Sequence, residues 1–306
     1  MGGQLMARGR RVVFGRINRR NPNQETFEER SFAEDMKVLA DSHLTTFTQE
    51  STANRPGRRW IAGDMTVTAE GDFLTGVLGF SERQQQVSFD DEAFSWMKAQ
   101  VEDSDAANEQ TIVPFAVDLR DGERWVAFAT TARLQDSSFR VGLENVLNHA
   151  VAKLGLMPTE WEVDLVTSTG VIREWIRRNP LVHNLRRTIK FTNPGKNLDD
   201  DRREMRALGA NRKTEEFAAR PRKTLDVDSD EFQEKLVGTE TGDLDVVMVS
   251  RGLHGVGKAT FNSRETIDSV EVSDFGNNLQ QGIDVVLAAL REYVASRGKP
   301  EQPELS

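Results

Sequence analysis

The basic side chains between Ile172 and Lys196 are the residues of this chain best suited to chemistry, and that chemistry is phosphate binding. The segment holds seven lysines and arginines against one acid, Glu174, although the whole chain has a formal net charge of −9. Exposed guanidinium and ammonium groups neutralise backbone phosphates and release the counterions condensed on nucleic acid. The same pattern also suits a solvated face whose partners are the protein's own acids, so the segment leaves both interpretations open.

Ten basic residues form the predicted DNA-binding set, because they fall on the polar sides of predicted elements or in basic clusters beside them. The set is Arg173, Arg177, Arg178, Arg186, Lys190, Lys196, Arg202, Arg203, Arg206 and Lys258. A further basic cluster, noted but left outside this set, is Arg212, Lys213, Arg220, Arg222 and Lys223.

A helix and a strand must position the first members of this set. Apolar residues at helical spacing predict a helix that begins near Ile172 and ends before Asn179-Pro180. Residues 185–191 alternate, which predicts a strand with Leu185, Ile189 and Phe191 on one face and Arg186, Thr188 and Lys190 on the other. We therefore expect Arg177, Arg178, Arg186 and Lys190 to form one phosphate-binding ridge. Arg187 shares the apolar face and is expected to be structural.

The stretch from Gly252 to Lys258 resembles a phosphate-binding loop of the form G-x-x-x-x-G-K. Such a loop needs a hydroxyl residue directly after the lysine and then a helix, whose amide groups hold the phosphates. Ala259 stands in that place, and residues 258–262 have the pattern of a strand. The glycines therefore favour a hairpin turn, and only Lys258 is kept as a contact to a phosphate backbone.

The sequence offers no catalytic or metal-ligating group. The four histidines, His43, His149, His183 and His254, have no ligand-like spacing, and the chain contains no cysteine. Asp199, Asp200 and Asp201 precede three arginines, which is typical of a helix start rather than a metal site. We predict a protein that is not an enzyme, with no catalytic residues, no metal and no cofactor.

Length and pattern predict an α+β fold in two parts, with mixed or antiparallel sheets backed by helices. The 306 residues suggest two domains, 1–157 and 158–306. A last helix, 275–297, carries an apolar stripe that is able to pack back on the N-terminal domain. Another helix is expected over Asp90–Val101. The chain has no apolar run of membrane-spanning length and no apolar signal core, so we expect a cytoplasmic protein without membrane insertion.

The order of elements resembles the phage-exclusion proteins of the lambda RexA type. In Arg187–Asn211 a strand enters an Asn-Pro turn and an acidic-then-basic helix follows, Gly242–Thr266 contains a glycine-rich hairpin, and Asp136–Leu154 is an upstream helix after a hairpin. This resemblance implies a dimeric, prophage-encoded protein that binds DNA without sequence preference and acts in phage exclusion. It also allows a second defence protein as a partner, and it carries over no catalytic residue.

The predicted function is therefore sequence-nonspecific binding of double-stranded DNA. One alternative is a scaffold or toxin-type partner that holds an acidic protein on its basic face, and a third is a metal-dependent nuclease. The apolar stripe from Leu279 to Val294 is long for a chain this polar, which favours a homodimer.

Overall fold

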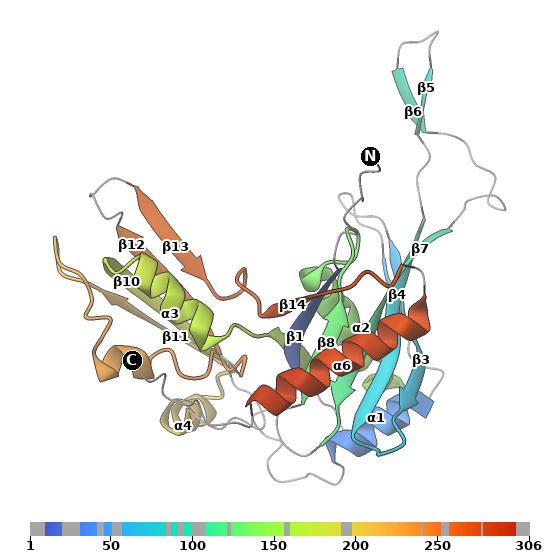
Figure 1. Cartoon of the computed structure of the whole chain (residues 1–306), viewed down its shortest axis with the longest axis horizontal. Helices are drawn as coiled ribbons and strands as arrows, with labels where there is room; N and C mark the ends of the chain where they lie inside the picture. The colour runs from blue at the N-terminus through green and yellow to red at the C-terminus, as the bar shows by residue number, and fades with distance from the viewer. Residues whose placement is uncertain are drawn as a thin grey trace, which may run out of the picture.

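The chain forms two antiparallel sheets and a separate two-stranded ribbon, seen in a computed structural model (Figure 1). The structure describes residues 10–19, 31–41, 46–50, 57–83, 87–90, 95–98, 108–120, 124–155, 160–190, 198–239, 241–251, 257–276 and 278–297. The predicted α+β class is confirmed. Among the described helices, none is long and apolar enough to cross a membrane.

The larger, eight-stranded sheet belongs mainly to the N-terminal half. Its strand order is β14-β1-β8-β7-β4-β3-β2, and β9 pairs with β1 as well. The strands are β1 (Arg10–Arg19), β2 (Thr46–Gln49), β3 (Arg58–Val67), β4 (Phe73–Arg83), β7 (Asn108–Asp118), β8 (Trp125–Ala129), β9 (Trp161–Leu165) and β14 (Ser269–Val272).

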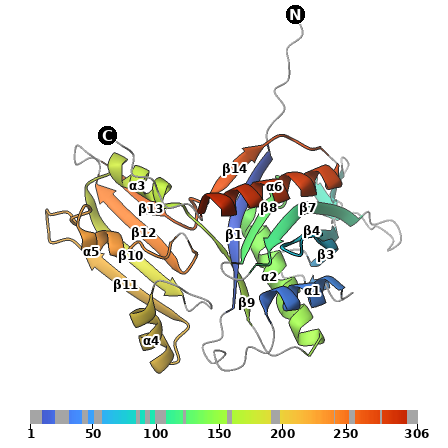
Figure 2. The same ribbon diagram turned by 60° about the horizontal axis from the view of Figure 1, so that its bottom comes forward.

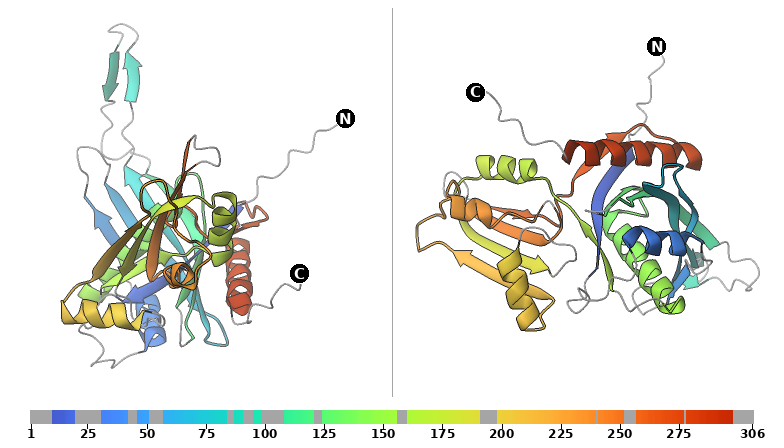
Figure 3. Two further views of the ribbon diagram at one scale, coloured as in Figure 1. Left: turned by 90° about the vertical axis from the view of Figure 1, so that its left-hand side faces the viewer. Right: turned by 90° about the horizontal axis from the view of Figure 1, so that it is seen from below.

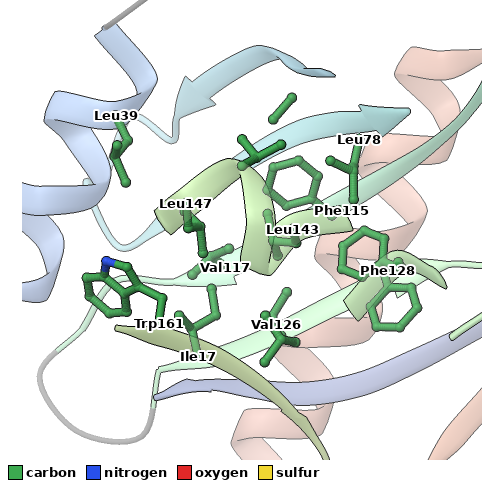
Figure 4. Packing of buried hydrophobic residues seen from close by; sticks show 14 of the residues in the cluster. Ile17, Leu39, Leu78, Phe115, Val117, Val126, Phe128, Leu143, Leu147 and Trp161 are labelled. Carbon is green, nitrogen blue, oxygen red and sulfur yellow. The ribbon is translucent and has the colours of Figure 1, made fainter. Parts of the chain in front are cut away.

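Helices cover both faces of this sheet (Figure 3). Helices α1 (Phe32–Asp41) and α2 (Asp136–Lys153) bury one face, where side chains such as Phe115 and Leu143 pack in the main core (Figure 4). Helix α6 (Leu279–Arg297) lies on the opposite face. Because side chains alternate along a strand, one strand serves both cores: Phe115 points to α2, and its neighbour Ala116 packs in the cluster beneath α6.

The smaller, four-stranded sheet has the order β11-β10-β12-β13. Its strands are β10 (Val182–Lys190), β11 (Arg212–Ala218), β12 (Leu244–Arg251) and β13 (Lys258–Asn262). The helices beside it are α3 (Thr169–Arg178), α4 (Asp199–Ala207) and α5 (Asp230–Glu234) (Figure 2).

All three helices of the smaller sheet pack into one core, on a single face of the sheet. Ile176 from α3, Met205 from α4 and Phe232 from α5 share this core with strand residues such as Leu185 and Met248. The side chains that alternate with these strand residues point to the other face. This second face, called the open face below, is not covered by any described helix.

The domain boundary differs from the expected one. Strand β9 pairs with β1, so the N-terminal part continues past residue 157 to about Leu165. Strand β14 and helix α6 return to the larger sheet, and Val286 and Leu290 of α6 are fully buried there. The C-terminal unit is therefore residues 168–266, inserted between two parts of the N-terminal unit. Strand pairing, which the sequence does not display, decides this boundary.

Two other expectations need correction. The predicted helix over Asp90–Val101 is wrong where the structure describes it, because β5 (Val87–Asp90) pairs with β6 (Ser95–Lys98). So few apolar residues fit both the helical period of 3.6 and the strand period of 2. Cross-strand pairing decided in favour of a strand. The apolar stripe of α6 packs on the larger sheet of the same chain, so it no longer supports a homodimer. The homodimer stays a prediction.

Candidate nucleic-acid interface

One end of the smaller sheet collects basic residues from four separate stretches of the chain. Strand β10 begins here, β12 ends here, and β13 starts beside the end of β12. Backbone hydrogen bonds tie the neighbouring segments in: Arg251 N donates to Leu181 O, and Leu225 N donates to Val182 O. The group, called the basic end below, is Arg177, Arg178, Arg220, Arg222, Lys223, Arg251 and Lys258, all of them exposed.

Helix α3 brings the first two of these residues to the basic end. The Ser168 side chain accepts a hydrogen bond from Val171 N and caps the helix start, and Asn179 ends the helix. Arg177 and Arg178 occupy the last turn, where the helix dipole favours cations. Their side chains are 77% and 74% exposed, and both form ion pairs with Glu174. The hydrogen bond from Arg177 lowers the pKa of Glu174, so this acid stays ionised.

Strands β12 and β13 bring Arg251 and Lys258 face to face. The two residues are direct partners in the antiparallel register, so their side chains lie on the same face of the sheet. Both are exposed, and neither forms an ion pair with a described residue. Like charges directly opposite each other destabilise a sheet. This pair therefore costs stability in the free protein.

The structure brings only part of the predicted set together. Arg177, Arg178 and Lys258 meet at the basic end, and Arg173 is exposed on the same helix α3. Arg186 is exposed on the open face, further along β10. Arg202, Arg203 and Arg206 lie on α4, near the opposite end of the sheet, where the chain enters β11. Lys196 falls outside the described residues.

The predicted ridge is wrong at Lys190. Alternation puts this residue on the open face, but its side chain is only 6% exposed. Its Nζ lies 2.7 Å from Asp164 Oδ1 of β9 and 2.9 Å from Asp245 Oδ1 of β12. The end of β10 lies against β9 of the N-terminal unit. Asp164 of that strand binds the Lys190 side chain, which is therefore buried and unable to contact a phosphate.

Lys190 belongs to a buried polar network that joins the two units. Asn18 Nδ2 donates to Asp164 Oδ2 at 2.7 Å, and Arg264 Nη2 donates to Asp245 Oδ2 at 2.6 Å. Nearby, Arg16 of β1 donates to Thr241 O at 2.6 Å and lies 3.7 Å from Asp243. Basic groups thus face every aspartate of the network, so the network is suited to holding the units together.

Arg187 has the structural role expected of it. Its side chain is 4% exposed, and its Nε donates to Glu215 at 2.6 Å while Nη2 lies 3.2 Å from Asp201. Asp201 also accepts from Lys213 Nζ at 2.7 Å. The acidic run at the start of α4 therefore provides ion-pair partners within the protein. In the described part of the chain, no group of three or more acids or histidines is placed to hold a metal ion.

Four members of the basic end lie outside the predicted set: Arg251, which was missed, and Arg220, Arg222 and Lys223, which were left out. A signal for Arg251 existed, because a hairpin between 244–251 and 258–262 places its last residue opposite Lys258. Residues 168–266 hold 19 of the 40 lysines and arginines but only 16 of the 49 acids, so the basic end sits on the positively charged unit of an acidic protein.

Comparison of the chain with protein-family models, with curated proteins and with solved structures finds no match. The resemblance to phage-exclusion proteins therefore stays a prediction. The geometry and charge of the basic end are the observations that bear on function.

Proposed function

We propose that the protein binds double-stranded DNA without sequence preference, through phosphate contacts at the basic end. The observation that carries this proposal is the exposed pair of Arg251 and Lys258, opposed across β12 and β13 without an acid partner among the described residues. A phosphate between them would relieve their repulsion. Binding of a phosphate would thus remove an unfavourable electrostatic interaction that the free protein contains.

The composition of the basic end supports a polyanion as the ligand. Seven basic residues lie at this end of the sheet, and Glu174 is the only acid in ion-pair contact with them among the described residues. Four strands abreast cover about 14 Å, at roughly 4.8 Å per strand spacing. A cluster of cations over that width is able to contact more than one phosphate of a bound duplex.

The aromatic residues nearby favour a duplex over a single strand. Sequence-tolerant binding of single strands uses aromatic rings on which bases stack. Trp175 is the aromatic residue of α3, and its ring packs on Phe261 in the interior, with 5.6 Å between ring centroids. Contacts to the backbone of a duplex need only the cations.

The biological setting is part of the same proposal and rests on the resemblance. It comprises a cytoplasmic, prophage-encoded protein, a role in phage exclusion, a homodimer and a second defence protein as a possible partner. The protein is proposed to act by binding, without catalysis.

Two variants test the proposal by titration of a labelled mixed-sequence DNA duplex across a salt series. Changing Arg251 and Lys258 together to Ala should weaken binding to all duplexes alike, and should flatten the slope of log affinity against log salt by roughly 0.9 per lost phosphate contact. Glu174→Gln should strengthen binding, because Arg177 and Arg178 lose their internal competitor.

Arg59→Ala is the matched control, because Arg59 is exposed but lies on β3 of the larger sheet, away from the basic end. Its affinity should equal that of the parent. The proposal is wrong if the parent shows no binding to duplex DNA in dilute salt, or if the double variant binds as the parent does. Displacement of the duplex by polyglutamate at equal charge concentration would instead favour the acidic-protein alternative.

A further inference from the structure

The open face of the smaller sheet continues from the basic end toward the N-terminal unit. Successive rows across the sheet, read from the register, are Lys258 and Arg251; then Thr260, Val249, Asn184 and Ala218; then Asn262, Val247, Arg186 and Glu216. The rows contain hydroxyl, amide and basic groups and one acid, Glu216, with two valines as their only large apolar members. Every residue in these rows is exposed or half-buried.

Arg186 on this face has an acid opposite it but does not bind that acid. Glu216 is its direct partner in the register of β10 and β11. The Glu216 carboxylate instead accepts a hydrogen bond from Asn184 Nδ2 at 2.7 Å. Arg186 is exposed and forms no ion pair with a described residue. Asn184 thus binds the carboxylate that the strand register places directly opposite Arg186.

We propose that the open face is a second phosphate-binding surface, and that Arg186 is its principal contact. A duplex held at the basic end would extend along β10 onto this face, with the exposed Thr260 beside its backbone as a hydrogen-bond donor. This inference rests on the proposed function and adds the path of the bound duplex.

The spacing of the two sets of cations fits one duplex. Arg186 lies opposite Val247, four residues along β12 from Arg251, which corresponds to about 14 Å at 3.4 Å per residue. Phosphates of one strand advance by about 3.4 Å along the duplex axis, so Arg186 lies about four base-pair steps along the axis from Arg251. Because the strands wind around the axis, the phosphate that Arg186 meets can belong to either strand. Asn184 keeps Arg186 available over this path by holding Glu216.

A solvated face would have the same polar composition, so the test must detect the role of Asn184. The decisive variant is Asn184→Ala, which changes no charge. It releases Glu216 to pair with Arg186, and should weaken binding of the mixed-sequence duplex several-fold in dilute salt. Adding Glu216→Gln to Asn184→Ala should restore the affinity, because the released competitor is then neutral.

Arg186→Gln should weaken binding by a similar factor and reduce the salt slope by roughly 0.9. Arg59→Gln, on β3 of the larger sheet, serves as the control for loss of one exposed charge. Each variant is first checked for an unchanged circular dichroism spectrum and unfolding midpoint, because Asn184 is half-buried while Arg186 and Glu216 are exposed.

The outcomes separate the two proposals. If the parent binds, and binding falls with the Arg251 and Lys258 double variant but not with Arg186→Gln or Asn184→Ala, the path over the open face is wrong and the proposed function stands. If the double variant also binds as the parent does, the proposed function itself fails. Loss of binding with Arg186→Gln but not with Asn184→Ala would overturn the role assigned to Asn184.

Discussion

Lys190 and Asp164 form a buried ion pair across the junction of the two units. Nζ lies 2.7 Å from Oδ1, and the two side chains are 6% and 1% exposed. Beside this pair the chain crosses between the units twice, and the crossings bind each other: Thr167 Oγ1 lies 2.7 Å from Thr266 O, and Asp268 N donates to Val166 O at 2.8 Å. The larger and smaller sheets are therefore joined by a buried ion pair and by two connecting chain segments that are hydrogen-bonded to each other.

Lys190→Met should destabilise the protein by about 3 kcal/mol, because it removes the buried cation that Asp164 and Asp245 share. Urea unfolding followed by circular dichroism and tryptophan fluorescence measures this free energy. Arg186→Met, an exposed residue of the same strand, is the control and should change stability by less than about 0.5 kcal/mol. Equal unfolding midpoints for the two variants would contradict the assignment of Lys190 to a buried ion pair.

Gly142 of α2 should not tolerate a methyl group, although alanine favours helices. A Cβ at Gly142 would overlap the ring of Trp60, a fully buried residue of β3. Overpacking of this kind costs about 1–3 kcal/mol, which outweighs a gain of about 1 kcal/mol in helix propensity. Thermal unfolding of Gly142→Ala should show a lower midpoint than the parent.

Gly170 of α3 provides the matched glycine for that experiment. The nearest atom to a Cβ there is Ser168 Oγ at 3.8 Å, so the space is open. Gly170→Ala should leave stability unchanged or raise it by up to about 1 kcal/mol. If both variants shift the midpoint in the same direction, the close packing of α2 on Trp60 is not the reason that position 142 requires glycine.

Glu144 should make stability depend on pH below neutrality. Burial raises the pKa of this carboxyl to about 7, against an ordinary value of 4.5, and neighbouring Glu162 and Asp164 act in the same direction. The opposing influences are the hydrogen bond from Val163 N to Oε1, at 2.9 Å, and the charge of Arg140. The native protein therefore holds a proton here more tightly than the unfolded chain does.

Because the pKa is raised on folding, this contribution to stability is complete below about pH 4.5 and is lost as pH rises through about 7. The loss is on the order of 2–3 kcal/mol. Glu144→Gln keeps the acceptor for Val163 N and removes the titration. Unfolding free energies measured from pH 4.5 to 8 should show that the variant gains most over the parent at the alkaline end. A constant difference across this range would contradict the raised pKa.

Local pattern in the sequence was enough to predict several elements. Phe139, Leu143 and Leu147 recur at helical spacing, and α2 forms there because one continuous stripe must be buried. Alternation along residues 185–189 likewise placed Arg186 on the polar face and Arg187 on the apolar face. These features depend only on the side-chain period of a helix or a strand, which is visible within a few consecutive residues.

The state of each charge was decided by tertiary structure. Alternation correctly put Lys190 on the face opposite the core, but Asp164, 26 residues away in sequence, covers it. Arg251 and Lys258 are paired through the register of two strands, and Asn184 binds Glu216, the acid that the register places opposite Arg186. Whether a basic residue is neutralised depends on distances between chain segments that only folding brings together. The sequence alone therefore determined which side chains are charged and on which face of an element they lie, and the fold determined which of them form ion pairs within the protein.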